Sequence, residues 1–179
     1  MIILMGVAGS GKSSQGRMLA DEMGFPWVST GEFLRMLISG ERRKAMLEGK
    51  LLEDSEIIGL TQKIFAMIDT DNEFILDGFP RTPGQADWLL AQLKHGQLNI
   101  SAVIHLQANQ DVVRERLLER GRQDDHPDAI KERFVEYRES ILPILEQFKA
   151  AGVAVHDIDG NQSMKDVHND IEAAIRSAT

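Results

Sequence analysis

Strand-like apolar runs alternate with helical patterns along this chain, and the alternation limits the folds open to it. A chain that places a helix between successive strands must cross back over the sheet each time, which makes the strands parallel. The pattern predicts an α/β fold, a doubly wound five-stranded parallel sheet with helices on both faces and ligands at the carboxyl ends of its strands. The strands are expected at Ile2–Met5, Pro26–Ser29, Glu73–Asp77, Ala102–Leu106 and Val153–Ile158.

Length and composition narrow the class of protein. The 179 residues fit one domain, expected to span 1–179, and the long stretch after the second strand predicts a helical insertion at about 30–59. The net charge of −8 argues against binding to nucleic acid or to an anionic membrane surface. The chain has no cysteine, no apolar run of membrane-spanning length and no room for a signal peptide before its first strand, so we expect a cytoplasmic protein.

A glycine-rich run from Gly6 to Ser13 follows the first strand and has the spacing G-x-x-x-x-G-K-[ST] of a phosphate-binding loop. Its backbone N–H groups converge on an anion, Lys12 reaches the outer phosphates, and a hydroxyl of Ser13 or Ser14 can ligate Mg²⁺. The following helix adds the positive end of its dipole. This loop makes the expected fold one of the P-loop NTPase type.

Two further motifs lie at the carboxyl ends of predicted strands. Ser29-Thr30-Gly31 follows the second strand, and Asp77-Gly78-Phe79-Pro80-Arg81 follows the third. The carboxylate of Asp77 can hold the water shell of Mg²⁺ beside the phosphate loop, and the guanidinium of Arg81 suits two-point contact with a phosphate.

Several arginines fall near predicted loops or helix ends: Arg35, Arg81, Arg120, Arg122 and Arg133. In an acidic chain this grouping indicates an anion site. Solvent-exposed salt bridges with neighbouring carboxylates are the alternative interpretation of the arginines taken alone. Asp124 and Asp125 are expected to orient Arg122 and Arg133 rather than to take part in catalysis.

Taken in order, these motifs resemble those of adenylate kinases over nearly the whole chain. The resemblance rests on Lys12-Ser13-Ser14-Gln15, on the run from Ser29 to Arg35, and on Asp77 to Thr82 with Gln85-Ala86. It continues in Arg116 to Arg120, in Gly121 to Asp125 with Arg133, and in Asp159-Gly160.

The resemblance implies a role for each matching residue. The ATP-binding residues would be Gly9, Ser10, Gly11, Lys12, Ser13, Ser14, Arg116, Arg120, Gly160 and Gln162. The AMP-binding residues would be Thr30, Arg35, Lys50, Leu51, Leu52, Gly78, Phe79, Pro80, Arg81, Gln85, Arg122 and Arg133. The catalytic residues would be Lys12, Arg81, Arg120, Arg122 and Arg133, with Mg²⁺ at Ser13 or Ser14 and at Asp77, partly through water.

The chain departs from the family pattern at three places. Only Gly121 separates Arg120 from Arg122, so the lid over the site, expected at about 121–127, is minimal. Ser13 stands where the family usually has glycine, so the loop also resembles that of gluconate kinases. The segment from Leu51 to Asp54 lacks the family's usual proline. The short lid affects how far the site closes over the ATP phosphates, and the missing proline affects the shape of the AMP pocket.

The expected function is an ATP-dependent phosphotransferase, an adenylate kinase of nucleotide biosynthesis that converts ATP and AMP to two ADP as a monomer. Thr30 and Gln85 favour adenine, since related pyrimidine kinases usually carry alanine at the position of Thr30. A kinase of CMP, UMP or another nucleoside monophosphate is the first alternative. A kinase-like nucleotide-binding regulatory module with weak turnover is the second.

Overall fold

The computed structural model describes residues 1–47, 52–121 and 125–178, which build a parallel sheet between two layers of helices. Its strand order is β2-β3-β1-β4-β5, and every adjacent pair is parallel. The strands are β1 (Ile2–Gly6), β2 (Trp27–Ser29), β3 (Ile75–Asp77), β4 (Ala102–Gln107) and β5 (Val155–Asp159). The predicted α/β fold with a five-stranded parallel sheet is confirmed.

The strand boundaries differ from the predicted ones by one or two residues, for local reasons. β5 begins at Val155 and not at Val153, because the N–H of Val153 bonds to the carbonyl of Phe148 at the end of the preceding helix. β2 begins one residue after Pro26, which has no N–H to donate but accepts a hydrogen bond from Ile75.

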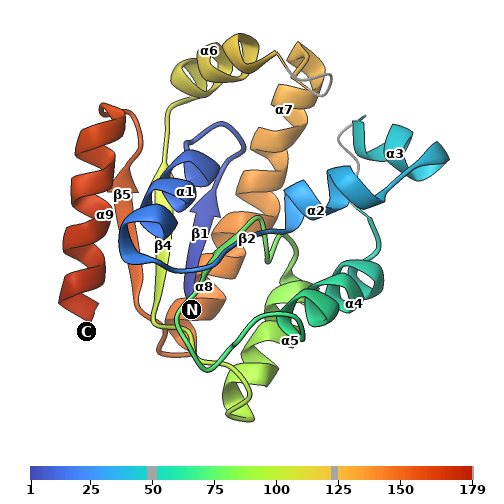
Figure 1. Ribbon diagram of the computed structural model, residues 1–179. Coiled ribbons are helices and arrows are strands. Elements are labelled where there is room, and N and C mark those ends of the chain that lie inside the picture. The colour runs from blue at the N-terminus through green and yellow to red at the C-terminus, as the bar shows by residue number, and fades with distance from the viewer. Residues whose placement is uncertain (48–51, 122–124, 179) are drawn as a thin grey trace.

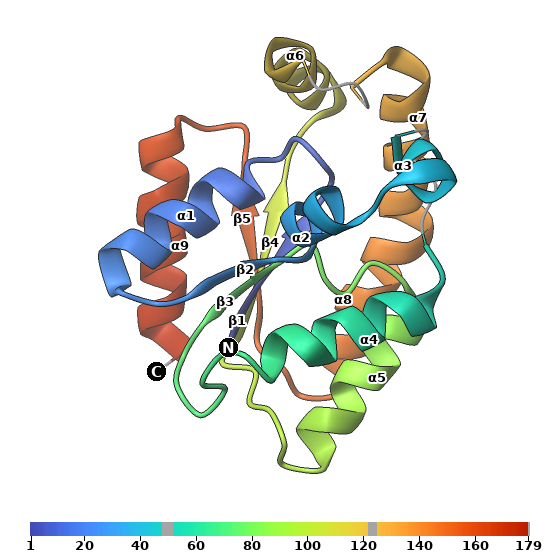
Figure 2. The same cartoon turned by 45° about the vertical axis from the view of Figure 1, so that its right-hand side comes forward.

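The helices cover both faces of the sheet (Figures 1 and 2): α1 and α9 lie on one face, and α4, α5 and α8 on the other. Across these described residues, no helix combines the length and the apolarity needed to cross a membrane. The helix bounds are α1 (Lys12–Met23), α2 (Thr30–Leu37), α3 (Gly40–Leu47), α4 (Asp54–Phe65), α5 (Pro83–Lys94), α6 (Gln110–Arg120), α7 (Pro127–Glu136), the π-helical turn η1 (Tyr137–Ile141), α8 (Leu142–Ala150) and α9 (Met164–Ala178).

The central strand β1 is buried on both sides, and its side chains alternate between two hydrophobic clusters. Ile3 and Met5 pack in the cluster under α4, α5 and α8, whereas Ile2 and Leu4 pack in the cluster under α1 and α9. A third cluster, with Val7 at its centre, joins the loop after β1 to α6 and α7. The phosphate loop therefore follows a central, fully buried strand and packs on a hydrophobic cluster of its own.

Two regions predicted from the sequence are described in part. The range 30–59 holds α2, α3 and the start of α4, and α4 runs on to Phe65 and packs Ile57, Ile64 and Phe65 into the core. Residues 48–51 lie outside the described part of the chain, as do 122–124 in the range 121–127. The insertion and the minimal lid stay predictions.

The packing of helices on the sheet predicts that the same substitution, Leu→Ala, changes the free energy of unfolding by very different amounts at a buried and at an exposed position. Leu89 on α5 is fully buried, whereas Leu118 on α6 is half exposed. We expect Leu89→Ala to lower the free energy of unfolding by about 2–5 kcal/mol through lost contacts and a cavity, and Leu118→Ala to lower it by less than about 1 kcal/mol. Urea denaturation of both variants measures this, and equal losses would contradict the packing described.

Candidate functional site

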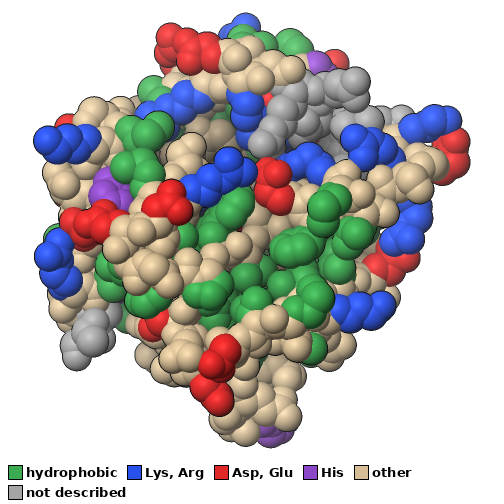
Figure 3. All heavy atoms as spheres, viewed as in Figure 1, with side chains coloured by type: hydrophobic (Ala, Val, Ile, Leu, Met, Phe, Trp, Pro, Cys, Tyr) green, Lys and Arg blue, Asp and Glu red, His purple; other side chains and the backbone are tan. Residues whose placement is uncertain are grey.

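One cavity of about 820 Å³ opens at the carboxyl ends of the strands. Figure 3, in the view of Figure 1, shows several Lys and Arg side chains near one another on the upper part of the visible surface, above a group of hydrophobic side chains. The cavity is lined by every predicted site residue that the structure describes: Gly9, Ser10, Gly11, Lys12, Ser13, Ser14, Thr30, Arg35, Leu52, Asp77, Gly78, Phe79, Pro80, Arg81, Gln85, Arg116, Arg120, Arg133, Gly160 and Gln162. Lys50, Leu51 and Arg122 lie outside the described residues.

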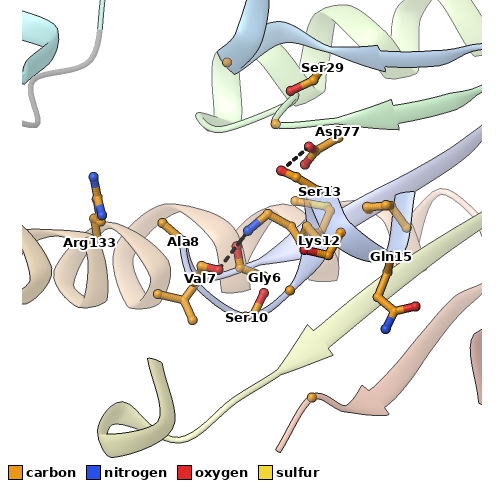
Figure 4. A pocket seen from close by; sticks show the side chains of 18 of the residues that line it. Gly6, Val7, Ala8, Ser10, Lys12, Ser13, Gln15, Ser29, Asp77 and Arg133 are labelled. Atoms are coloured by element: carbon orange, nitrogen blue, oxygen red, sulfur yellow. Dashed lines mark hydrogen bonds between the residues drawn. The ribbon is translucent and has the colours of Figure 1, made fainter. Parts of the chain in front are cut away.

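The loop between β1 and α1 wraps back toward the strand that it leaves. Gly9 has a φ of +93°, and a Cβ there would lie 2.8 Å from the side chain of Leu117, so the close packing of loop on α6 requires glycine. Lys12 curls over the loop and donates to the carbonyls of Gly6 and Val7, at 2.8 Å each (Figure 4). Its ammonium group is thus held near the carbonyls at the start of the loop, and Lys12 itself begins α1.

Burial lowers the pKa of Lys12 from 10.5 to about 8, because desolvation penalises the charged ammonium. The negative charge of Asp77 opposes this effect, and the positive charge of Arg81 adds to it. A bound anion would favour the charged form again, so this lysine is arranged to gain interaction energy from a phosphate.

Ser13 and Asp77 lie together across the gap between α1 and β3. The Ser13 hydroxyl donates to Oδ2 of Asp77 over 2.6 Å, as Figure 4 shows, whereas Ser14 is exposed to solvent. The Asp77 carboxylate is buried at the carboxyl end of its strand. A hydroxyl and a carboxylate beside a phosphate loop form the all-oxygen donor set that Mg²⁺ prefers.

The ends of β2 and β3 form the opposite wall of the cavity. Thr30 begins α2 and donates its hydroxyl to the carbonyl of Gly78 over 2.8 Å. Gly78 has a φ of +83°, and a Cβ there would lie 3.0 Å from that hydroxyl oxygen. The buried amide of Gln85 accepts from the backbone N–H of Arg81 and donates to Asp54, over 2.9 Å in each case. These bonds hold Thr30 and Gln85 in one fixed surface.

Each of two arginines on this wall is held by a carboxylate on a helix. Arg81 makes a two-point contact with Glu136 on α7, from Nε and Nη2 over 2.9 Å each. Arg35 donates to Glu32 one turn away on α2, over 2.6 Å. Both guanidinium groups stay partly exposed in the cavity, where they can meet an anion.

Asp125 pairs with two arginines from different helices. Arg120 on α6 makes a two-point contact with it, at 2.8 and 2.6 Å, and Arg133 on α7 donates to it over 2.8 Å. Asp125 is buried, and its bonds to both side chains bring together two guanidinium groups that line the cavity. The prediction that Asp125 orients Arg133 is confirmed.

Arg116 connects α6 to the loop before α9. Its Nη1 donates to the carbonyl of Gly160 over 2.8 Å, and Gln162 lies beside it in the cavity wall. A Cβ on Gly160 would come within 2.8 Å of the carbonyl oxygen of Gln107. The loop is therefore pressed against β4 at this point, next to the phosphate loop.

Sequence reasoning missed Glu136, Asp54 and Tyr137. Glu136 holds Arg81 from a position 55 residues away, and Asp54 accepts from Gln85 and Thr82. Tyr137 lines the cavity and bonds to His105 on β4. The available signal was the spacing of Arg133, Glu136 and Tyr137, which places them near one another on a helix.

The arrangement can hold two anionic groups at one place. One wall has the loop amides and Lys12, the other has Arg35 and Arg81, and Arg120 and Arg133 lie at the edge of the same cavity. A carboxylate or carbonyl partner holds each of these cations. Such preorganised charge suits a reaction in which negative charge is spread over phosphate oxygens.

Comparison with known proteins agrees with this geometry. The family model described as adenylate kinase matches residues 4–153. The chain is 36% identical over 172 residues to an adenylate kinase of Corynebacterium urealyticum, covering 93% of each chain. It is 34% identical over 184 residues both to an adenylate kinase of Leptospira biflexa (97% of this chain, 98% of the relative) and to adenylate kinase 1 of a Synechocystis strain (98% and 96%).

The lowered pKa of Lys12 predicts a particular dependence of stability on pH. Between about pH 8 and 10.5 the unfolded chain keeps a proton on Lys12 that the folded chain has released, so the free energy of unfolding rises with pH in this window. Lys12→Met removes this rise. Urea denaturation at pH 7 to 10.5 should therefore show wild type gaining stability relative to Lys12→Met as the pH increases.

The matched control is Lys165→Met at an exposed position on α9. It should follow wild type across the whole pH range. A constant difference between wild type and Lys12→Met would show that Lys12 titrates at its ordinary value.

Proposed function

Because this chain belongs to the adenylate kinase family, we propose that it transfers the γ-phosphoryl group of ATP to AMP and forms two ADP. The family makes it an ATP-dependent phosphotransferase of the nucleoside monophosphate kinase type. The observation that supports the pair of substrates best is the single cavity with a phosphate loop on one wall and two arginines on the other.

The phosphate loop forms the donor half of the site. Loop residues from Gly9 to Ser14, with Lys12 at their centre, bind the ATP phosphates. Arg116 and Arg120 come from α6, and Gly160 and Gln162 border the ATP base. The hydrogen bond from Arg116 to the Gly160 carbonyl supports this assignment. It joins α6, proposed to contact the ATP phosphates, to the loop before α9, proposed to contact the adenine base.

The walls after β2 and β3 form the acceptor half. Arg35 and Arg81 hold the phosphate of AMP, Thr30 and Gln85 face its base, and Leu52 and the turn from Gly78 to Pro80 line the pocket. The burial of Thr30 and Gln85 supports a fixed surface that discriminates between bases. Lys50 and Leu51 belong to the same proposed pocket, from outside the described residues.

Phosphoryl transfer asks the protein to align two anions and to offset their repulsion. Arg120 and Arg133 line the same cavity, where they stabilise charge on the transferred group together with Lys12 and Arg81. Asp125 fixes the first two and Glu136 fixes Arg81. Arg122 is proposed to join them from outside the described residues. No side chain is needed as a strong base.

Ser13 and Asp77 fit Mg²⁺ as ligands, Asp77 partly through water. Their hydrogen bond places both oxygens at the foot of the phosphate loop, which favours Ser13 over the exposed Ser14 as the direct ligand. Mg²⁺ held by these residues would supply charge neutralisation on the ATP phosphates.

The described residues of a single chain supply both walls of the cavity, so a monomer would be sufficient for the proposed reaction. The absence of cysteine supports a reducing compartment such as the cytoplasm. Thr30 and Gln85 favour AMP over CMP or UMP as acceptor, and the set of held arginines favours an enzyme over a weakly active regulatory module.

Arg81→Ala and Lys12→Met should each reduce transfer by about a thousandfold or more, because each removes a charge that offsets the repulsion between the nucleotides. A coupled assay with ATP, Mg²⁺ and AMP measures turnover, and circular dichroism checks that the variants are folded. Arg138→Ala, at an exposed arginine outside the cavity, is the matched control and should keep wild-type activity. Near-normal turnover in either site variant would overturn the assignment.

The base-facing residues predict the order of acceptors. AMP should have a kcat/KM at least about tenfold above those of CMP, UMP and GMP, because a site built to hydrogen-bond one base leaves polar groups unpaired with another. Comparing the four monophosphates at fixed MgATP measures this order. A preference for CMP or UMP would identify the chain as a pyrimidine monophosphate kinase.

A further inference from the structure

A histidine and two glutamates lie together where α1 packs against α9. Figures 1 and 2 show that both helices cover the same face of the sheet. Glu22 comes from the last turn of α1, and His168 and Glu172 come from α9. Each offers one ligand atom, and these atoms all lie within 4.8 Å of one another. None of the three lines the cavity at the phosphate loop.

The spacing within α9 suits chelation. His168 and Glu172 are four residues apart, so their side chains lie on the same face of the helix. Glu22 completes the group from the facing helix, with its carboxylate 2.7 Å from Nε2 of His168. Its side chain is 54% exposed and therefore free to adjust its position, whereas that of His168 is 9% exposed and held in place.

Gln15 determines which imidazole nitrogen faces the carboxylates as an acceptor. Its amide nitrogen donates to the carbonyl of Met164 over 2.8 Å, so its amide oxygen is the atom that faces Nδ1 of His168, at 3.1 Å. Nδ1 must then carry a hydrogen. In a neutral imidazole, Nε2 presents its lone pair to Glu22, and an acceptor that faces a carboxylate at this distance requires a cation or a proton between them.

This pattern is that of a metal-binding histidine. Such a histidine typically donates its second ring N–H to a carbonyl or carboxylate, which fixes the ring and makes the other nitrogen a better ligand. Glu172 is itself held, by Arg176 through Oε2 over 2.8 Å. One imidazole nitrogen with two carboxylates suits a divalent first-row metal such as Zn²⁺, and suits Mg²⁺ poorly.

We propose that Glu22, His168 and Glu172 form a binding site for a divalent transition metal such as Zn²⁺ that joins α9 to α1. Gln15 holds the histidine from the first helix, and both Gln15 and Met164 border the nucleotide cavity. A metal at this site therefore fastens the C-terminal helix to the helix that begins at the phosphate loop. Because the three ligands come together only in the folded chain, the bound metal raises the free energy of unfolding.

Isothermal titration of Zn²⁺ into the tag-free, nucleotide-free full chain tests the site. We expect one Zn²⁺ per chain in wild type, with binding at least about a hundredfold weaker in His168→Gln and in the Glu22→Gln, Glu172→Gln double variant. At a hundredfold excess of free Zn²⁺ over Kd, the Tm of wild type should rise by about 5–10 °C, and that of the variants should not. Circular dichroism in a chelator confirms that the variants are folded.

His95→Gln, at an exposed histidine outside the cluster, is the matched control and should bind Zn²⁺ as wild type does. Unchanged binding in His168→Gln would place Zn²⁺ elsewhere on the chain and overturn the proposal. Absence of Zn²⁺ binding by wild type would overturn it too, since a proton on Nε2 would then fill the gap between His168 and Glu22.

Discussion

The structure depends on one strand that is buried on both faces. β1 hydrogen-bonds to β3 on one side and to β4 on the other, and its side chains anchor both helical layers. Because the neighbouring strands are parallel to it, the segments that follow β1, β3 and β4 all emerge at one edge of the sheet. This places the phosphate loop beside Asp77, although 64 residues separate Ser13 from that carboxylate.

The second constraint is electrostatic. The chain carries a net charge of −8, yet Lys12 and six arginines line its cavity among the described residues. Carboxylates such as Glu136 and Asp125 hold these arginines in position, and carbonyl oxygens hold Lys12 and Arg116. Cations held in this way need little reorganisation when a phosphate arrives, and this is what catalysis of phosphoryl transfer requires of a protein.

The cluster of Glu22, His168 and Glu172 is a second place, outside the cavity, where carboxylates and a held side chain lie close together. There an excess of carboxylate surrounds a buried histidine whose orientation is set by Gln15. Since Gln15 lies two residues after the phosphate loop and lines the cavity, the packing of α9 and the shape of the cavity share one residue. Stabilisation of the two helices by a bound metal would act next to the phosphate loop.

Local patterns in the sequence determined the strands, the phosphate loop and five of the arginines that line the cavity, because periodicity, glycine spacing and charge are properties of short segments; Arg17 in the cavity wall was not predicted. They also suggested that Asp125 orients Arg133, eight residues away on the chain. The tertiary structure alone decided that Glu136 holds Arg81, that Ser13 rather than Ser14 faces Asp77, and that Glu22 meets His168. Those pairs join elements far apart in sequence, and no local pattern specifies how two helices or a helix and a strand come together in space.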